Sequence, residues 1–266
     1  VVSSAIEVWG NLTYNNVNRC LGPDATVVIG FDTEYEFMAD EDIELPDERP
    51  GNHVLCYTFT VADPTDFENR ISGIIYTTGP TRRHRLEFNG FLSRVIQCAI
   101  AAKLLAGPPE RVLACCHFSR ADLPAFRDFK QLKREFDAVR RTYATTTKPM
   151  TRSLYTPTGV PFSLKVVLLD TMLLAPNGHQ SLKALGELLD FDKIVIPPGA
   201  IEKMSTLMRD DPALFEAYAV RDAEVSAKWL IKILKFFDGE LAIDPGRQPP
   251  PTLGAAPVKK FTPISK

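Results

Sequence analysis

The sequence lacks the features that define several common protein classes. It contains no apolar run near the ~20 residues that a membrane-spanning helix requires. Its first residues show neither the basic segment nor the long apolar stretch of a secretory signal. The five cysteines are odd in number and include no C-x-x-C pair, which favours reduced thiols over a disulfide framework. We therefore expect an intracellular protein.

Several catalytic signatures are also missing. There is no G-x-x-x-x-G-K-[ST], no G-x-G-x-x-G and no G-x-S-x-G, which argues against the phosphate-binding loop, dinucleotide and α/β-hydrolase classes. The four histidines are far apart and form no H-x-x-x-H pair, so a zinc site is not expected. The formal net charge of −2 gives no overall indication of a polyanionic partner. Carboxylates remain as the candidate chemistry.

What is present is an ordinary globular composition with an uneven distribution of charge. The chain has 266 residues, of which 45% are hydrophobic and 24% are charged. Residues 31–48 hold nine acids and no base, whereas residues 127–152 hold eight bases against three acids. A shorter basic cluster spans residues 82–85. These segments are either solvated surface or phosphate-binding rims beside an acidic, metal-binding centre.

Hydrophobic patterning predicts an α/β fold. Five strands are expected, at 27–35, 53–63, 71–79, 111–118 and 162–170. The first three have short connections and should be antiparallel, while the last two follow crossovers and should be parallel to the first. A helix is expected from residue 90 towards Gly107, and a long one from Pro212, capped by Asp211, to about Phe237. The prediction is a mixed five-stranded sheet flanked by helices.

The chain divides into three parts on the same grounds. Residues 1–26 read as an N-terminal extension and residues 27–240 as one catalytic domain. Residues 241–266 are rich in proline and lack periodicity, so they are interpreted as a flexible tail or linker.

Two carboxylates end the first predicted strand. Asp32 and Glu34 are two residues apart and therefore project from the same face. Two close anions favour a cation between them, and oxygen ligands suit Mg²⁺ or Mn²⁺. Asp122 follows the fourth strand; it is either part of this centre or the cap of a short helix.

Asp222 is out of place in the apolar stripe predicted along the last helix, which consists of Leu214, Tyr218, Val225, Trp229, Ile233 and Phe236. An unpaired buried carboxylate is costly, so Asp222 should either join Asp32 and Glu34 or have a buried Arg or Lys partner. Tyr218 lies one turn earlier on the same side, and Glu224 should face solvent. Asp170 is interpreted as a helix cap. His117 either neighbours the site or is a satisfied residue at a strand end, and the second interpretation is favoured. His179 is interpreted as a plain loop residue.

Together these residues resemble the DEDD-type (DnaQ-like) 3′–5′ exonucleases of the tyrosine subclass, with proofreading domains of family B-like DNA polymerases as the nearest relatives. FDTEYEF supplies Asp32 and Glu34, HFSRADLPAF supplies Asp122, and Tyr218-Ala-Val-Arg-Asp222 supplies the third motif, in the family's order. The second motif lacks the Asn and the aromatic residue that usually precede its Asp. The resemblance implies an RNase H-like fold.

The resemblance also implies a mechanism. Two Mg²⁺ or Mn²⁺ ions are expected, one held by Asp32, Glu34 and Asp222 and the second by Asp122, with Asp32 bridging. Tyr218 would aim the attacking water. The expected reaction is hydrolysis of the 3′-terminal phosphodiester of single-stranded DNA, releasing nucleoside 5′-monophosphates, as in proofreading during DNA replication.

Strand binding is expected from basic and aromatic side chains. The candidates are Arg82, Arg83, Phe118, Lys130, Lys133, Arg134, Arg140 and Arg141. Terminal bases would stack on Phe31, Tyr35, Phe37 or Phe118, although core packing is the favoured role for most of these aromatics. A polymerase domain or subunit is the expected partner, reached through the C-terminal tail, and the expected location is cytoplasmic or nucleoid-associated.

Alternatives stay open: an exoribonuclease or internal nuclease, and a non-catalytic nucleic-acid-binding or scaffolding domain. The nuclease interpretation fails if Asp122 or Asp222 lies far from Asp32 and Glu34, or if a lysine or arginine fills the space between them.

Overall fold

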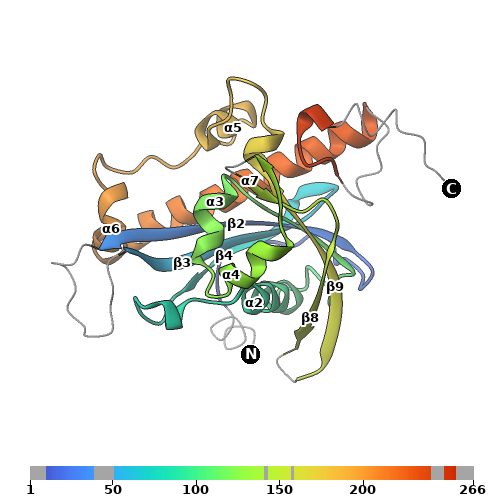
Figure 1. Cartoon of the computed structure of the whole chain (residues 1–266), viewed down its shortest axis with the longest axis horizontal. Coiled ribbons are helices and arrows are strands. Elements are labelled where there is room, and N and C mark those ends of the chain that lie inside the picture. Colours follow the sequence, from blue (N-terminus) through green and yellow to red (C-terminus); the bar gives the residue numbers. More distant parts are fainter. Residues whose placement is uncertain (1–9, 39–50, 141–142, 157–158, 241–248, 256–266) are drawn as a thin grey trace.

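The computed structural model describes residues 10–38, 51–140, 143–156, 159–240 and 249–255. Its centre is a seven-stranded mixed sheet in the order β1-β4-β3-β2-β5-β9-β8 (Figure 1). The strands of this sheet are β1 (Asn11–Asn16), β2 (Thr26–Met38), β3 (Gly51–Asp63), β4 (Asp66–Tyr76), β5 (Arg111–Cys116), β8 (Met150–Tyr155) and β9 (Pro161–Asp170). A separate two-stranded sheet pairs β6 (Asp137–Arg140) with β7 (Tyr143–Thr145).

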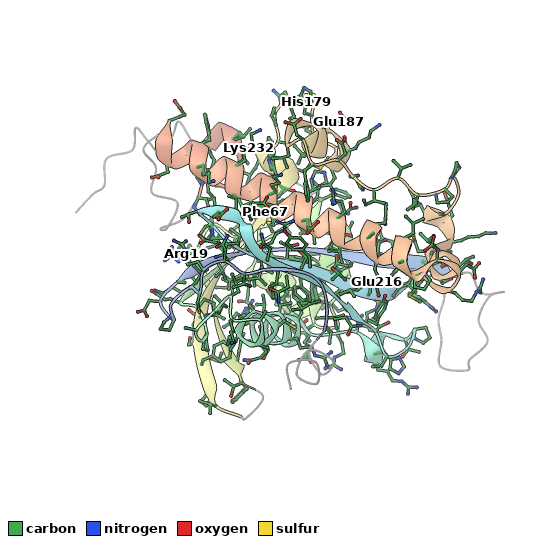
Figure 2. The ribbon with its side chains drawn as sticks, turned by 180° about the vertical axis from the view of Figure 1, so that it is seen from behind. Arg19, Phe67, His179, Glu187, Glu216 and Lys232 are labelled. Carbon is green, nitrogen blue, oxygen red and sulfur yellow. The ribbon has the colours of Figure 1, made fainter. Side chains whose placement is uncertain are left out.

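Helices cover both faces of the large sheet. They are α2 (Phe88–Ala101), α3 (Ser119–Asp122), α4 (Phe129–Leu132), α5 (Leu182–Leu188), α6 (Met204–Asp210) and α7 (Pro212–Gly239). In Figure 1, α7 runs along one face of the sheet and α2 lies against the other. Phe67, labelled in Figure 2, lies beneath α7 on the face that α7 covers. No helix in the described part of the chain has the length and apolarity to cross a bilayer.

The predicted strand directions are confirmed. β2 pairs antiparallel with β3, and β3 with β4. β2 pairs in parallel with β5, and β5 with β9. The predicted count of five strands is wrong for this sheet, because β1 and β8 form its two edges. Both edge strands are short and partly exposed, so their sequences do not show the apolar run of a central strand.

The predicted terminal segments are only partly described. The expected N-terminal extension contributes β1, which pairs with β4. Of the expected tail, 249–255 is described and contains a short helical turn at Leu253–Ala255. Residues 241–248 and 256–266 lie outside the described residues.

The alternation of side chains along β2 separates two cores. Val27, Ile29 and Phe31 belong to the core that contains α2. Val28 belongs to the core that contains α7. Successive side chains of a strand point to opposite faces, so Gly30, Asp32 and Glu34 follow Val28 onto the α7 side and Thr33 onto the other.

Gly30 allows α7 to approach β2 closely. A Cβ at this position would lie 2.4 Å from the carbonyl oxygen of Ala223 and 2.8 Å from the Cβ of Ala227. No real Cβ tolerates such distances, so only glycine permits this contact. The close approach brings Asp222, the neighbour of Ala223, to the level of Asp32 on β2.

The start of α7 follows the sequence prediction. The Asp211 side chain accepts a hydrogen bond from Leu214 N at 3.0 Å, and Pro212 occupies the first turn. The predicted apolar stripe holds through Ile233 but not to its end. Phe236 is 44% exposed and the neighbouring Phe237 is buried in its place.

Candidate metal centre

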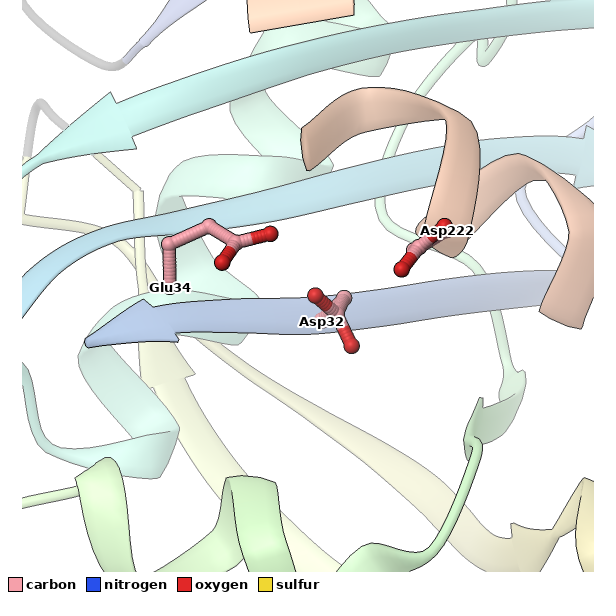
Figure 3. A group of neighbouring side chains, drawn as sticks. All are labelled: Asp32, Glu34 and Asp222. Carbon is pink, nitrogen blue, oxygen red and sulfur yellow. The ribbon is translucent and has the colours of Figure 1, made fainter. Parts of the chain in front are cut away.

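Three carboxylates from two elements converge at the end of β2. One carboxylate oxygen from each of Asp32, Glu34 and Asp222 lies within 4.8 Å of those of the other two. Figure 3 shows Asp32 and Glu34 rising from the strand towards Asp222 on α7. Asp32 and Glu34 are half-buried, while Asp222 is 6% exposed.

A cavity of about 550 Å³ opens over this group. Its walls include the three carboxylates, Tyr218 of α7 and His117 at the end of β5. Ile201, Glu202 and Met204 form another part of the wall, and the Glu36 side chain holds that segment by accepting a hydrogen bond from Ser205 N at 2.8 Å. No lysine or arginine among the described residues lines the cavity, so its lining is acidic.

Asp122 reaches the same strand from its other face. Its Oδ1 accepts hydrogen bonds from Thr33 Oγ1 at 2.8 Å and from Thr33 N at 3.2 Å. Neither alternative capping role is present, because the Asp122 side chain makes no cap hydrogen bond in either short helix it borders. Asp122 lines the cavity, but it is not in the three-carboxylate group.

Burial raises the pKa of all four carboxyl groups, and repulsion by neighbouring carboxylates adds to this for Asp32, Glu34 and Asp122. The pKa of Asp32 stands well above its ordinary value through burial, then through Asp122, Glu34 and Asp222. Burial, followed by the charge of Asp222, raises the pKa of Glu34 to about 8. Burial also raises the pKa of Asp122 to about 8, against the opposing Thr33 hydrogen bonds. The pKa of Asp222 is raised by burial and partly lowered by Lys193.

Lys193 is the site residue that the sequence pattern does not reveal. Its Nζ lies 2.7 Å from Asp222 Oδ2, so Asp222 does have a lysine partner, although this lysine is half-buried rather than buried. Nevertheless, Lys193 is not among the residues that line the cavity. Its neighbours Asp190 and Asp192 give the segment an acidic character, and no periodic pattern marks the lysine. Lys193 is recognised only in the tertiary structure, where its segment packs against α7.

The donor set fits a hard divalent cation. Asp222 Oδ1 and Asp122 Oδ2 are both buried and lack a hydrogen-bond partner. Lys193 lowers the pKa values of Asp32, Glu34 and Asp222, yet burial, with repulsion for Asp32 and Glu34, keeps all three raised. Carboxylate oxygens are the ligands that Mg²⁺ and Mn²⁺ prefer.

Tyr218 lies beside the carboxylates with its hydroxyl kept protonated. Burial, then the charges of Asp222, Glu34 and Asp32, raises its pKa. Lys193 Nζ lies 5.3 Å from the centre of the Tyr218 ring.

The other polar residues near the site have structural partners. Asp170 caps the turn Thr171–Leu174 by accepting from Met172 N, as predicted, and also accepts from Phe118 N and from Ser119. His117 Nδ1 lies 3.0 Å from Thr171 Oγ1, and burial lowers its pKa to about 4. His179 is an exposed loop residue, labelled in Figure 2.

The prediction for Glu224 is wrong. It is 6% exposed rather than solvent-facing. Its Oε1 accepts a hydrogen bond from Ser72 Oγ at 2.9 Å and lies 3.3 Å from Arg70 Nε. Helix α7 therefore buries a second carboxylate, that of Glu224, and the guanidinium of Arg70 on β4 compensates its charge.

The two basic segments contact each other through Arg82 and Arg127. Arg82 donates to the carbonyl of Arg127 at 2.9 Å, and Arg127 donates back to the carbonyl of Arg83 at 3.3 Å. We call the exposed bases Arg82, Arg83, Arg127, Lys130, Lys133 and Arg134 the basic ridge. The side chain of Arg140 and all of Arg141 lie outside the described residues.

The aromatic candidates differ in their availability. Phe31 is buried in the core, which confirms the core-packing alternative and excludes stacking on a base. Phe37 is 67% exposed and lines the cavity, as does Tyr35. Phe118 is half-buried and has a left-handed backbone with a φ of 60°, uncommon for a non-glycine residue.

The chain is similar in sequence to part of a known DNA polymerase. No known family model matches the chain. The chain is 32% identical to the primer-independent DNA polymerase PolB of Escherichia coli in an alignment 262 residues long that covers 91% of this chain. The chain spans 28% of the length of that polymerase, so the similarity concerns one segment of it.

Proposed function

We propose that this chain is a metal-dependent 3′–5′ exonuclease domain with an RNase H-like fold, acting on the 3′ end of single-stranded DNA. The observation that carries the proposal is the convergence of Asp32, Glu34 and Asp222 within 4.8 Å below an acidic cavity. The similarity to a DNA polymerase supports DNA as the substrate and proofreading as the role. It also motivates the proposal that the domain works beside a polymerase domain.

The carboxylates have distinct positions towards bound cations. Asp32, Glu34 and Asp222 would hold one ion, and Asp122, with its free Oδ2, would serve a second beside Asp32. Ions bound there supply Lewis-acid polarisation of the phosphodiester and a deprotonated water near neutral pH. Thr33 donates two hydrogen bonds to Asp122, so the carboxylate of Asp122 is held in place before any ion binds.

Tyr218 and Lys193 complete the site from the side of α7. The protonated Tyr218 hydroxyl donates a hydrogen bond that orients the attacking water, a contribution of position rather than of proton transfer. Lys193 keeps one positive charge against Asp222 and attracts the phosphate group of the substrate to the same edge.

The rest of the strand would follow the basic ridge. A pocket of about 180 Å³ between the cavity and the ridge is lined by Tyr35, Ala121, Arg85 and their neighbours. Arg85 donates to the carbonyls of Asn52 and Pro124, which leaves its charge without a carboxylate partner in these contacts. Phe37, exposed at the mouth of the cavity, would stack on a terminal base.

The decisive experiment compares 3′-labelled and 5′-labelled single-stranded DNA and RNA with Mg²⁺, Mn²⁺ or EDTA. We expect stepwise shortening from the 3′ end of DNA, release of nucleoside 5′-monophosphates and no reaction in EDTA. Internal cuts, or shortening from the 5′ end, would contradict the proposal. Faster degradation of RNA would reassign the substrate to the exoribonuclease alternative.

A non-catalytic DNA-binding domain is the second candidate, and the Lys193–Asp222 contact is the observation that favours it. If Lys193 fully replaces a cation, titration with Mn²⁺ will show no binding, while single-stranded DNA still binds in EDTA. Binding of Mn²⁺ that Asp32→Ala abolishes would exclude this candidate.

A further inference from the structure

Lys193 lies in a segment that has no regular secondary structure of its own. α5 ends at Leu188, and Asp190 then adopts a left-handed backbone with a φ of 49°. Phe191 N donates to the Gly186 carbonyl at 3.0 Å, which turns the chain back towards α7. Since neither a helix nor a strand fixes Lys193, tertiary contacts of the preceding residues must set its position.

One side chain of α7 contacts both residues that precede Lys193. Arg221 Nη1 donates to the Asp192 carbonyl at 2.9 Å. The Arg221 guanidinium carbon lies 4.0 Å from the centre of the Phe191 ring. Arg221 precedes Asp222 in the chain, and Asp192 precedes Lys193. The Arg221–Asp192 hydrogen bond therefore links the two backbone segments that carry the Lys193–Asp222 ion pair.

Arg221 and Phe191 each make further contacts that fix their positions. Arg221 Nε lies 3.3 Å from Glu224 Oε2, and the other oxygen of Glu224 is bound by β4. The Phe191 ring packs edge-on against Phe67, with ring centres 5.8 Å apart, and Lys228 Nζ lies 4.3 Å from it. Phe67 is labelled beneath α7 in Figure 2.

We propose that Phe191, Arg221 and Glu224 form an anchor that positions the Lys193 ammonium against Asp222, and that the anchor thereby controls how strongly the carboxylates bind a divalent cation. Arg221 and Phe191 are positioning residues that act through Lys193. A lysine has a flexible four-carbon stem, so a fixed backbone is needed to hold its charge at one place. The inference rests on the proposed function only in taking the carboxylates as a cation site.

The anchor has a measurable consequence in the absence of substrate. A positive charge 2.7 Å from Asp222 repels an incoming Mn²⁺ ion. Lys193→Met removes that charge, so we expect Mn²⁺ to bind roughly tenfold more tightly. Phe191→Leu and Arg221→Lys keep the net charge but loosen the segment, so each should tighten Mn²⁺ binding by roughly three- to tenfold.

The test is a double-mutant cycle measured by Mn²⁺ titration calorimetry. If the anchor acts through Lys193, Phe191→Leu and Arg221→Lys will have little further effect in the Lys193→Met background. A merely structural role predicts the opposite pattern: the same change in both backgrounds. Thermal unfolding of the same variants is measured alongside, so that a general loss of folding is distinguished from a change in Mn²⁺ affinity of a folded protein.

Matched controls are available on α7 and on the neighbouring helix α6. Phe236→Leu changes an exposed phenylalanine of α7, and Arg209→Lys changes an exposed arginine of α6. Both should leave Mn²⁺ binding unchanged. If Phe191→Leu does not fold, the Arg221→Lys cycle decides alone, because it preserves the ring and the charge.

The proposal is overturned if Lys193→Met binds Mn²⁺ like the wild type, or if the anchor variants act equally with and without Lys193. If the effects of the anchor variants on Mn²⁺ binding depend on Lys193 but the protein degrades no DNA, the exonuclease proposal is refuted and the anchor proposal is supported. An active exonuclease without that coupling would refute only the anchor.

Discussion

Four carboxyl groups and one ammonium group share the end of β2, and the balance between them decides what each residue does. The pKa of Asp32 is raised by burial and by the charges of three neighbouring carboxylates together. Asp170 is also buried, yet hydrogen bonds from Phe118, Ser119 and Met172 satisfy it. The contrast distinguishes a strained carboxylate of a functional site from a satisfied structural one.

Removing the charge of Asp32 should abolish cation binding and stabilise the protein. Asp32→Asn relieves repulsion among the acids, and each unit of raised pKa corresponds to about 1.4 kcal/mol. In EDTA at pH 8 we expect a higher midpoint of thermal unfolding, together with loss of Mn²⁺ binding and of 3′ shortening. Glu187→Gln, an exposed carboxylate of α5, is the control and should change neither property. A destabilised Asp32→Asn protein would contradict the strain argument.

The Tyr218 hydroxyl should matter for rate and not for cation binding. Tyr218→Phe keeps the ring beside Lys193 but removes the donor that orients the water, so single-turnover cleavage should slow by about ten- to a hundredfold. Mn²⁺ affinity should stay the same. Tyr155→Phe, an exposed tyrosine on β8, serves as the control. An unchanged cleavage rate would remove Tyr218 from the mechanism.

At the level of elements, the site exists because α7 crosses β2 in contact. β2 presents its carboxylates on the α7 side, and Gly30 removes the side chain that would hold the helix away. The cap at Asp211 fixes where the helix begins, which sets the turn on which Asp222 falls.

Gly30→Ala tests this contact. Its methyl group would overlap the backbone of Ala223, so we expect a loss of about 1–3 kcal/mol in the free energy of unfolding and a weakened Mn²⁺ site. Gly90→Ala in α2 is the matched control. Nothing lies within 4 Å of its added Cβ, and the helix should gain up to about 1 kcal/mol. Urea unfolding of both variants checks the signs. Equal effects would show that the α7 contact does not limit the site.

At the level of the whole molecule, the chain combines an acidic cavity with a separate group of exposed basic side chains. The cavity lining carries carboxylates, and the basic ridge gathers two segments about forty residues apart in sequence through the Arg82 and Arg127 contacts. This separation suits a polyanion that is held by the ridge and cut at the cavity.

Binding of single-stranded DNA should depend on salt through the ridge. Arg82→Ala combined with Arg83→Ala should weaken binding and lower the slope of log K against log[salt] by about 0.7 for each DNA phosphate that the variant no longer neutralises. Lys183→Ala combined with Arg209→Ala removes two exposed bases elsewhere and should leave the slope unchanged. Fluorescence anisotropy at several salt concentrations measures both. An unchanged slope in the ridge variant would assign strand binding to another surface.

The raised carboxyl pKa values predict an unusual pH dependence of stability. Without a cation, the folded protein holds more protons than the unfolded chain between about pH 4 and the raised values near 8, so the free energy of unfolding falls as pH rises. His117, whose pKa is lowered to about 4, acts in the opposite direction below its ordinary value of 6.5. The decline should therefore be clearest between pH 6.5 and 8.

Thermal unfolding in EDTA across that interval checks the sign. Saturating Mg²⁺ or Mn²⁺ should remove most of the decline, because the cation replaces the protons. Asp32→Asn should flatten it without metal. A rise in stability across the interval in EDTA would mean that the carboxyl groups are compensated in the folded protein.

Much of the site was predictable because it rests on local periodicity. The two-residue period of β2 puts Asp32 and Glu34 on one face, and the helical period of α7 puts Asp222 within an apolar stripe. The strand directions followed from the lengths of the connections. The edge strands were missed because a polar, half-exposed strand carries little of the pattern on which such predictions depend.

Local patterns in the chain are enough to establish which residues of β2 and α7 face the sheet and where the long helix begins, because periodicity and capping act over a few neighbouring residues. Three-dimensional folding was needed to bring Lys193 to Asp222, to let Thr33 hold Asp122 and to bury Glu224. These contacts join residues far apart in the chain. They depend on where each loop returns, which no local pattern encodes.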